Sequence, residues 1–353
     1  MEELNAPPSN PSSVHFFGQM AKARLSKARS AIASHLKVKP TEVVFTSGGT
    51  ESMNLLIQGF CSKEPGHIIT SNIEHSCVYQ TLKKLQEKGW EVTYVPAGSF
   101  GAVTPSQIEE AIKPNTRLIV LSSANSETGV KHEIESISKI AEKAKIGFIV
   151  DAVASFGKEA LVIPHGVTGM GFSSHKIHGP KGVGFAFIRS HAQIKPLVFG
   201  GEQEFTLRSG TENLPGIVGL AAAVELLREQ ESITSGMNTL RDYFEKELQV
   251  RASPILINGE GPRVSNVSNI SFPDVDGETL LIQLDLHGVA ASHGSACSSG
   301  SLEPSRILLN MGLAKSRAGS SVRFSLSRYT TKEEIDKAIA IIASLVKQIR
   351  ELS

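Results

Sequence analysis

The chain has 353 residues, of which 40% are hydrophobic and 20% charged, and its formal net charge is +1. This length allows a large core and about two domains, and the balanced charge argues against a nucleic-acid or membrane-surface partner. The three cysteines (Cys61, Cys77 and Cys297) form no C-x-x-C pair, which argues against a disulfide framework or zinc ribbon and favours a cytoplasmic location.

The first eleven residues contain Pro, Asn and Ser without an apolar stretch, so we expect a loop and no signal peptide. Short apolar strands then alternate with amphipathic helices up to about residue 190. Thr104 and Gln107 have the spacing of a capping box that starts one of these helices. The strands expected here are Val43–Thr46, Ile68–Thr70, Val92–Val95, Leu118–Leu121, Phe148–Val150 and Gly184–Ile188. This alternation predicts an α/β fold with a mostly parallel sheet, which binds ligands at the carboxyl ends of its strands.

The rest of the chain predicts a smaller α+β unit. We expect a long linking helix from Leu214 into the low 230s and a last helix that starts at the Thr331-x-x-Glu334 capping box. Between them we expect strands at Val267–Phe272 and Val322–Leu326 and a helix at Glu278–Leu286. We therefore assign residues 12–230 to a large α/β domain and 231–353 to a small C-terminal domain, with loop 1–11 packed on the small one.

The segment Ser47-Gly48-Gly49-Thr50 follows a strand and opens a helix. Backbone N–H groups at such a helix N-terminus bind anions, and the hydroxyls of Thr50 and Ser52 would add donors. The segment lacks the Gly-Lys-Ser/Thr of a nucleotide P-loop. A glycine turn of this kind is common, so it favours a phosphate site without proving one.

Lys176 follows an apolar strand and lies among Ser, His and Gly residues. A lysine shielded in this way has a lowered pKa that favours Schiff-base chemistry, although most lysines are solvated surface charges. Asp151 ends a neighbouring strand, where a carboxylate suits the protonated pyridine nitrogen of pyridoxal phosphate (PLP) or simply caps a turn. His175 and His178 have no carboxylate or thiolate clustered with them, so we expect no metal.

Cys297 lies in a Gly/Ser-rich segment, Ser292–Ser301, which is typical of a reactive thiol rather than a core one. Cys61 and Cys77 lie in apolar, helix-like surroundings, so we expect both to be ordinary buried thiols.

Together these segments resemble the fold-type I PLP-dependent enzymes of the class-V aminotransferase kind, and more narrowly the group I cysteine desulfurases of the NifS/IscS kind. The resemblance runs from about Asn10 to the C-terminus. It rests on the order and number of these motifs: Thr46-Ser-Gly-Gly-Thr-Glu-Ser52, Glu74-His75, Asn125-x-Glu-Thr-Gly129, Val150-Asp151-Ala152, Ser174-His175-Lys176-x-x-Gly-Pro-Lys-Gly182, Arg208-Ser-Gly-Thr211-Glu-Asn213, Gly294-Ser-Ala-Cys297 and Val322-Arg323-Phe-Ser-Leu326.

The resemblance implies a role for each matching residue. Lys176 would bind PLP covalently, Asp151 would pair with the ring nitrogen, and His75 would stack on the ring and move protons. Asn125 would orient cofactor and substrate, and Arg323 would bind the substrate carboxylate. The phosphate would be held by Gly49, Thr50, Ser173 and His175, and by Thr211 of a neighbouring subunit.

The implied activity is conversion of L-cysteine to L-alanine with a persulfide on Cys297, which would supply sulfur for iron–sulfur clusters or thio-cofactors. The implied partners are a second copy of the chain in a homodimer and a sulfur-acceptor or scaffold protein. Two alternatives remain open: a lyase acting on selenocysteine or cysteine sulfinate, and a catalytically impaired paralogue that acts as a binding subunit.

The chain departs from the family pattern in two respects. Family members carry a Gln three residues after the aspartate, which donates to the PLP phenolate oxygen, whereas this chain has Ala154. We expect this loss to cost about 1–3 kcal/mol unless Ser155 or a water substitutes. The family's opening Asp-x-x-Ala-Thr-Thr segment has no counterpart here, which leaves open a truncated sequence or a pocket without that wall. The longer C-terminal tail by which some members dock a scaffold protein has no counterpart either.

Overall fold

A seven-stranded sheet forms the centre of the larger unit, with the strand order β1-β7-β6-β5-β4-β2-β3. The computed structural model describes residues 5–62, 64–227, 230–294 and 304–352. Strand β7 pairs antiparallel with β1 and β6, and the other pairings in this sheet are parallel. The sheet is therefore mostly parallel, as predicted. Its strands are β1 (Val43–Thr46), β2 (His67–Ser71), β3 (Glu91–Val95), β4 (Thr116–Ser122), β5 (Gly147–Asp151), β6 (Gly169–Ser173) and β7 (Gly184–Ile188).

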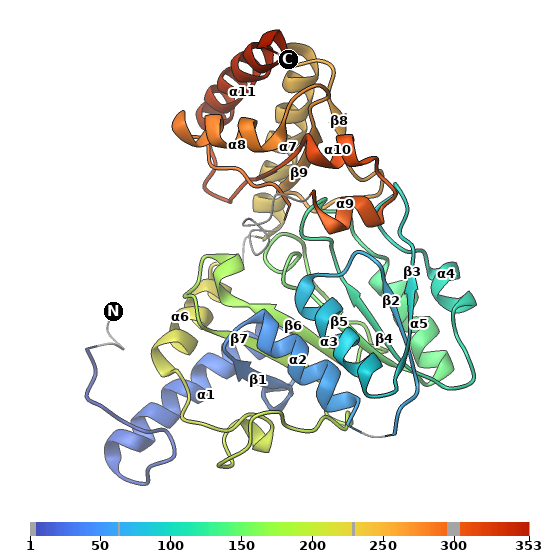
Figure 1. The fold of residues 1–353 in the computed structure, drawn as a ribbon. Coiled ribbons are helices and arrows are strands. Elements are labelled where there is room, and N and C mark those ends of the chain that lie inside the picture. The colour runs from blue at the N-terminus through green and yellow to red at the C-terminus, as the bar shows by residue number, and fades with distance from the viewer. Residues whose placement is uncertain (1–4, 63, 228–229, 295–303, 353) are drawn as a thin grey trace.

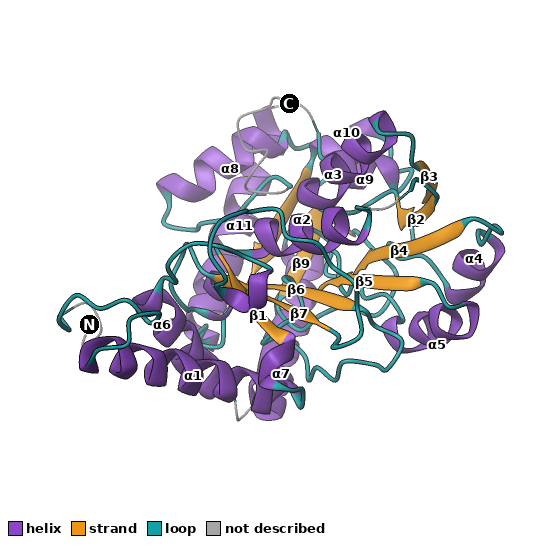
Figure 2. Cartoon of the chain, turned by 90° about the horizontal axis from the view of Figure 1, so that it is seen from below, coloured by secondary structure: helices purple, strands orange, loops and turns teal. Residues whose placement is uncertain are grey.

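Helices cover both faces of this sheet because its strands are apolar on both sides. Val43 and Phe45 pack into the core beneath α1 and α6, whereas Val44 between them packs into the core beneath α2 and α3. Figure 2 shows these helices on opposite sides of the strands. One layer contains α1 (Phe16–Leu36), α4 (Pro105–Glu110), α5 (Ile134–Ala144) and α6 (Leu214–Glu225), and the other contains α2 (Gly49–Phe60) and α3 (Ser76–Glu87).

A second unit lies at the top of Figure 1, built on a three-stranded antiparallel sheet in the order β10-β9-β8. Its core joins the sheet to α7, α8 and α11, and it includes the buried residues Ile335, Ile339, Ile342 and Val346 of the predicted last helix. The elements are α7 (Gln230–Arg251), β8 (Leu256–Ile257), β9 (Val267–Ser271), α8 (Gly277–Leu286), β10 (Ser321–Ser325) and α11 (Lys332–Leu352). Between α8 and β10 lie α9 (Arg306–Asn310) and α10 (Lys315–Gly319), whose buried residues Ile307, Leu308 and Ala318 join the core of the larger unit.

The long helix predicted from Leu214 into the low 230s is wrong. Helix α6 ends at Glu225, and α7 begins at Gln230. The apolar face of α6 packs against the core that α1 shares, whereas Phe244 and Leu248 of α7 belong to the core of the second unit. The two helices therefore serve different cores.

The described part of the N-terminal loop, from residue 5 onward, leads into α1 and lies beside it in both views, away from the three-stranded sheet. The packing expected for loop 1–11 on the small domain is therefore not seen for the part of that loop that the structure describes. The division of the chain at residues 230 and 231 stays a prediction. Within the described ranges, no helix is both long and apolar enough to cross a membrane.

Candidate active site

The first turn of α2 forms an anion cradle at the carboxyl edge of the large sheet. A Cβ added at Gly49 would lie 2.6 Å from Val153 Cγ2, so only glycine allows α2 to approach the turn after β5 this closely. Ser173, the buried last residue of β6, lies next to this turn, and its Oγ lies 3.0 Å from His175 Nδ1. Thr50 is exposed on the same helical turn. Backbone N–H groups, a hydroxyl and an imidazole thus gather where the sequence predicts a phosphate.

Ser52 does not join this cradle. Its side chain is fully buried, and its Oγ lies 2.8 Å from Thr46 Oγ1. Ser52, which was expected to donate to the phosphate, therefore stabilises the turn between β1 and α2 from its buried side.

Asp151 and Lys176 lie at the ends of adjacent strands. Asp151 ends β5, and Lys176 is in the 3-10 turn Ser174–Ile177 that follows β6, the parallel neighbour of β5. Asp151 is buried, and its carboxylate accepts the Val153 N–H at 2.9 Å. Burial raises the pKa of Asp151, whereas the hydrogen bond from Val153 and the nearby charge of Lys176 lower it. The structure thus brings the predicted carboxylate, amine and imidazole together.

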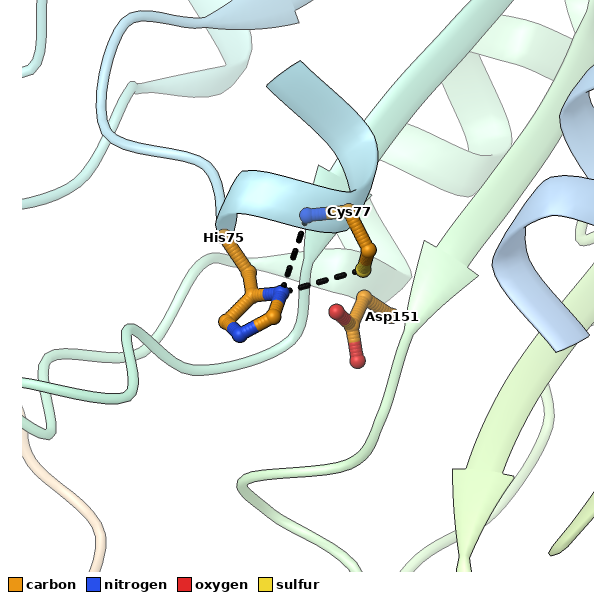
Figure 3. Close-up of side chains that lie close together, drawn as sticks. All are labelled: His75, Cys77 and Asp151. Carbon is orange, nitrogen blue, oxygen red and sulfur yellow. Dashed lines mark hydrogen bonds between the residues drawn. The ribbon is translucent and has the colours of Figure 1, made fainter. Parts of the chain in front are cut away.

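His75 precedes the first residue of α3 and caps the helix with its ring (Figure 3). Its Nδ1 accepts the backbone N–H of Cys77 at 3.1 Å and lies 3.0 Å from Cys77 Sγ. The ring nitrogen, the sulfur and a carboxylate oxygen of Asp151 all lie within 4.8 Å of one another. Cys77 is only partly buried and its sulfur faces His75, so it is not the ordinary buried thiol that was expected, whereas Cys61 is buried as predicted.

Asn125 organises the loop between β4 and α5. Its buried side chain donates to the Ile73 carbonyl at 3.0 Å and accepts the N–H groups of Glu127 and Thr128 at 2.9 and 3.0 Å. The loop in turn contacts the second unit, because Lys131 N–H donates to the Pro262 carbonyl at 2.8 Å. Asn125 therefore fixes this wall of the site, and its contact with a ligand stays a prediction.

Arg323 and both borders of the Cys297 segment meet this same loop. Arg323 Nη1 donates to the Ser126 carbonyl at 3.1 Å, and its backbone pairs with Ser292. Cys297 lies outside the described residues. On one side of that gap, a Cβ at Gly294 would lie 3.4 Å from Glu127 Oε2, and on the other side Ser305 Oγ donates to the same oxygen.

Thr211 lies on an exposed segment that is joined to the phosphate cradle. Arg208 Nε forms a 2.9 Å ion pair with Glu51 Oε1, and Glu51 Oε2 accepts the N–H of Ser47 before α2. Thr211 itself is exposed, as a residue that serves another subunit would be.

Ala154 faces apolar neighbours. It packs partly buried against Ala124, Val264 and Val267. Ser155 is buried with its Oγ 2.6 Å from Ser123 Oγ, so its hydroxyl is already engaged and the suggestion that it replaces the family's Gln is not supported.

The sequence model of the family described as Aminotransferase class-V matches residues 1–338. This chain belongs to the class-V aminotransferase family. A protein of Dictyoglomus turgidum described as cysteine desulfurase IscS is 41% identical over 350 residues, which cover 98% of this chain and 89% of the relative. A mitochondrial cysteine desulfurase of Arabidopsis thaliana is 38% identical, covering 98% of this chain and 78% of the relative.

Solved structures agree with this membership. A NifS-like protein superposes with a TM-score of 0.88 at 35% identity, covering 96% of this chain and 92% of the other. A structure described as SspA in complex with cysteine has a TM-score of 0.80 at 34% identity, covering 91% of this chain and 92% of the other. The predicted fold-type I architecture is thus confirmed.

As a member of the class-V aminotransferases, the chain is a PLP-dependent enzyme. The residues present fit this cofactor. Burial deprives the Asp151 carboxylate of water and raises its pKa, and a protonated pyridine nitrogen is the partner that such a charge needs. The N–H groups of the α2 cradle suit the phosphate of PLP, and the amine of Lys176 suits its aldehyde.

Glu74 is a second buried carboxylate near this site, which sequence reasoning mentioned only as part of a motif. It is 1% exposed, its Oε1 accepts from Ser71 Oγ at 2.6 Å, and its Oε2 accepts the Ser122 N–H at 2.8 Å. Burial raises its pKa to about 8, and the charge of Asp151 contributes. Glu74 is therefore largely protonated at neutral pH.

A Glu74→Gln variant is expected to make stability less dependent on pH. Because the folded pKa is about 8 against a usual 4.5, the folded state holds a proton that the unfolded state has lost, and wild-type stability falls as pH rises through this window. Glutamine can accept the Ser122 N–H through its carbonyl oxygen and donate its amide N–H to Ser71 Oγ, and it has no proton to lose. The variant should therefore be more stable by about 2–4 kcal/mol near pH 8. Urea unfolding from about pH 5 to 8 measures this, with Glu87→Gln on the exposed face of α3 as control. Parallel wild-type and Glu74→Gln curves would contradict it.

Proposed function

We propose that this chain is a PLP-dependent cysteine desulfurase that converts L-cysteine to L-alanine and carries the released sulfur on Cys297. The observation that carries the proposal is the convergence of Asp151, His75 and Lys176 at the strand ends, beside the anion cradle of α2. The curated relatives are described as cysteine desulfurases, and one solved relative is described as a complex with cysteine.

Bound PLP supplies an electron sink for the charge that develops at the substrate Cα. Lys176 would hold the cofactor through Nζ, and its amine would move the Cα proton as a base. Asp151 holds the proton on the pyridine nitrogen, since its buried carboxylate favours a cationic partner. The N–H groups of Gly49 and Thr50 hold the phosphate together with Ser173 and His175.

Arg323 is the group that binds the substrate carboxylate. Its guanidinium reaches the Asn125 loop from β10, with Nη1 on the Ser126 carbonyl, and a planar guanidinium matches a carboxylate in two-point geometry. Asn125 shapes the same wall. The substrate is therefore held between the two units of the chain.

Cys297 then takes the sulfur. Its thiolate attacks the substrate sulfur, a new S–S bond forms, and the Cβ–S bond breaks with its electron pair left on the substrate. Protonation of that carbon yields alanine, so no outside oxidant is required. The described borders of the Cys297 segment, Gly294 and Ser305, both lie at Glu127 beside Ser126 and Arg323, which supports this role.

A homodimer with shared sites completes this proposal. Thr211 reaches the phosphate of the partner copy from its exposed segment. Two large apolar side chains that precede Thr211 in the chain are exposed to solvent: Phe199 (82% exposed) and Phe205 (46% exposed). They support an interface at this part of the surface. We further propose a cytoplasmic location, supported by the free thiols Cys61 and Cys77, and delivery of sulfur to an acceptor or scaffold protein for iron–sulfur clusters or thio-cofactors.

Incubation with PLP and L-cysteine without reductant tests the proposal. One sulfur atom should appear on the peptide that contains Cys297, with alanine formed in step, as peptide masses and an alanine assay measure. Cys297→Ser should form no persulfide and little alanine, whereas Cys61→Ser serves as a matched thiol control. PLP bound at Lys176 with neither product would exclude desulfuration of cysteine and leave the selenocysteine or cysteine-sulfinate alternatives to be assayed in the same way.

A further inference from the structure

The imidazole of His75 has an unusual place at the start of α3. The residue before a helix normally caps it with a hydroxyl or carboxylate oxygen, but here Nδ1 accepts the Cys77 N–H at 3.1 Å. A backbone N–H can only donate, so Nδ1 carries no proton. The neutral ring must then carry its proton on Nε2.

The thiol of Cys77 adds a second donor on the same side of the ring. Its Sγ lies 3.0 Å from His75 Nδ1. Burial raises the pKa of Cys77, and the charge of Asp151 raises it further, so the sulfur keeps its proton. An N–H and an S–H from one residue thus face one nitrogen, with Asp151 flanking the sulfur (Figure 3).

Nitrogen, sulfur and carboxylate oxygen within 4.8 Å of one another also form a potential zinc ligand set. Two features of this site oppose a cation. The lone pair of Nδ1 already accepts an N–H, and the first turn of α3 presents the positive end of the helix dipole. A hydrogen-bonded group therefore describes these side chains better than a metal site.

We propose that Cys77 is a positioning residue that holds His75 as the Nε2–H tautomer, so that His75 serves the reaction as a hydrogen-bond donor through Nε2. With two donors on Nδ1, the ring proton stays on Nε2 while His75 caps α3, and Nε2 presents an N–H to the site. This inference deepens the proposed function and rests on it for the reaction, whereas the tautomer is a property of the chain itself.

Nitrogen NMR of the PLP-loaded enzyme labelled with ¹⁵N-histidine tests the tautomer. The His75 signals are assigned as those missing from His75→Gln. Nδ1 is expected at the shift of an unprotonated imidazole nitrogen and Nε2 at that of a protonated one. A proton on Nδ1, or shifts averaged between the two tautomers, would overturn the proposal.

Variants at Cys77 test the contribution of the thiol. Cys77→Ala keeps the backbone N–H but removes the S–H, so we expect the Nδ1 signal to move and kcat to fall by about three- to tenfold, with KM changed less than about twofold. Cys77→Ser restores a donor and should restore the Nδ1 signal and kcat, whereas Cys61→Ala should change neither of these. An unchanged Nδ1 signal and kcat in Cys77→Ala would overturn the role of the thiol. Because the NMR signals do not depend on turnover, they separate this outcome from a failure of the proposed desulfurase activity.

Discussion

Replacing Lys176 with alanine is expected to lower the rate of alanine formation from L-cysteine by at least about a thousandfold. The variant loses both the amine that binds PLP and the base that moves the Cα proton. The fold should remain intact, because the 3-10 turn is held through its backbone: Gly179 N–H donates to the Ser174 carbonyl at 3.1 Å, and Lys158 Nζ donates to the Lys176 carbonyl at 2.9 Å. Alanine keeps both bonds.

Turnover and the absorbance of PLP that survives dialysis measure this loss. Lys139→Ala, which removes an exposed lysine paired with Glu135 on α5, is the control and should behave as wild type. Urea unfolding should show that Lys176→Ala is within about 1 kcal/mol of wild type. Near-normal turnover, or PLP retained on another lysine after borohydride reduction and peptide mapping, would contradict the assignment.

The large sheet was predictable because most of its strands, the edge strand β3 excepted, are buried on both faces. Such strands appear in a sequence as short continuous apolar runs, and segments such as Leu118–Leu121 and Phe148–Val150 lie within the observed β4 and β5. The direction of β7, antiparallel between β1 and β6, was not predictable from these runs. The break between α6 and α7 was missed because periodicity describes one helix face and does not reveal which core that face joins.

Which of the candidate site residues lie together could be anticipated where a residue's place at a strand end decides its neighbours. Asp151 ends β5 and Lys176 follows β6, so parallel pairing of these strands brings the two together. Cys77 was misjudged because an apolar context suggests burial, whereas its place in the first turn of α3 directs its sulfur to His75. Ser155 failed as a donor for a similar reason: its hydroxyl is engaged by Ser123, a residue on another segment that no local pattern identifies.

An Asp151→Asn variant is expected to lose activity and gain stability. Asparagine keeps the acceptor for the Val153 N–H, but its neutral amide cannot hold the proton on the pyridine nitrogen. Turnover should therefore fall by about a hundredfold to a thousandfold. PLP should also bind more weakly, since the phosphate cradle and Lys176 remain but the ring nitrogen loses its charged partner.

The stability of the PLP-free protein should change in the opposite direction. Burial raises the folded pKa of Asp151 above its usual 3.8, so keeping the carboxylate ionised costs stability at pH values above the folded pKa. This cost disappears as the pH falls from the folded pKa to the unfolded one. Asp151→Asn should thus unfold at higher urea concentration than wild type near pH 8, by about 1–3 kcal/mol, and the difference should shrink toward pH 4. A variant that loses both stability and activity would instead make Asp151 a structural residue of the β5 turn. Opposite changes are the signature of a carboxylate that the fold buries at a cost because the cofactor requires its charge.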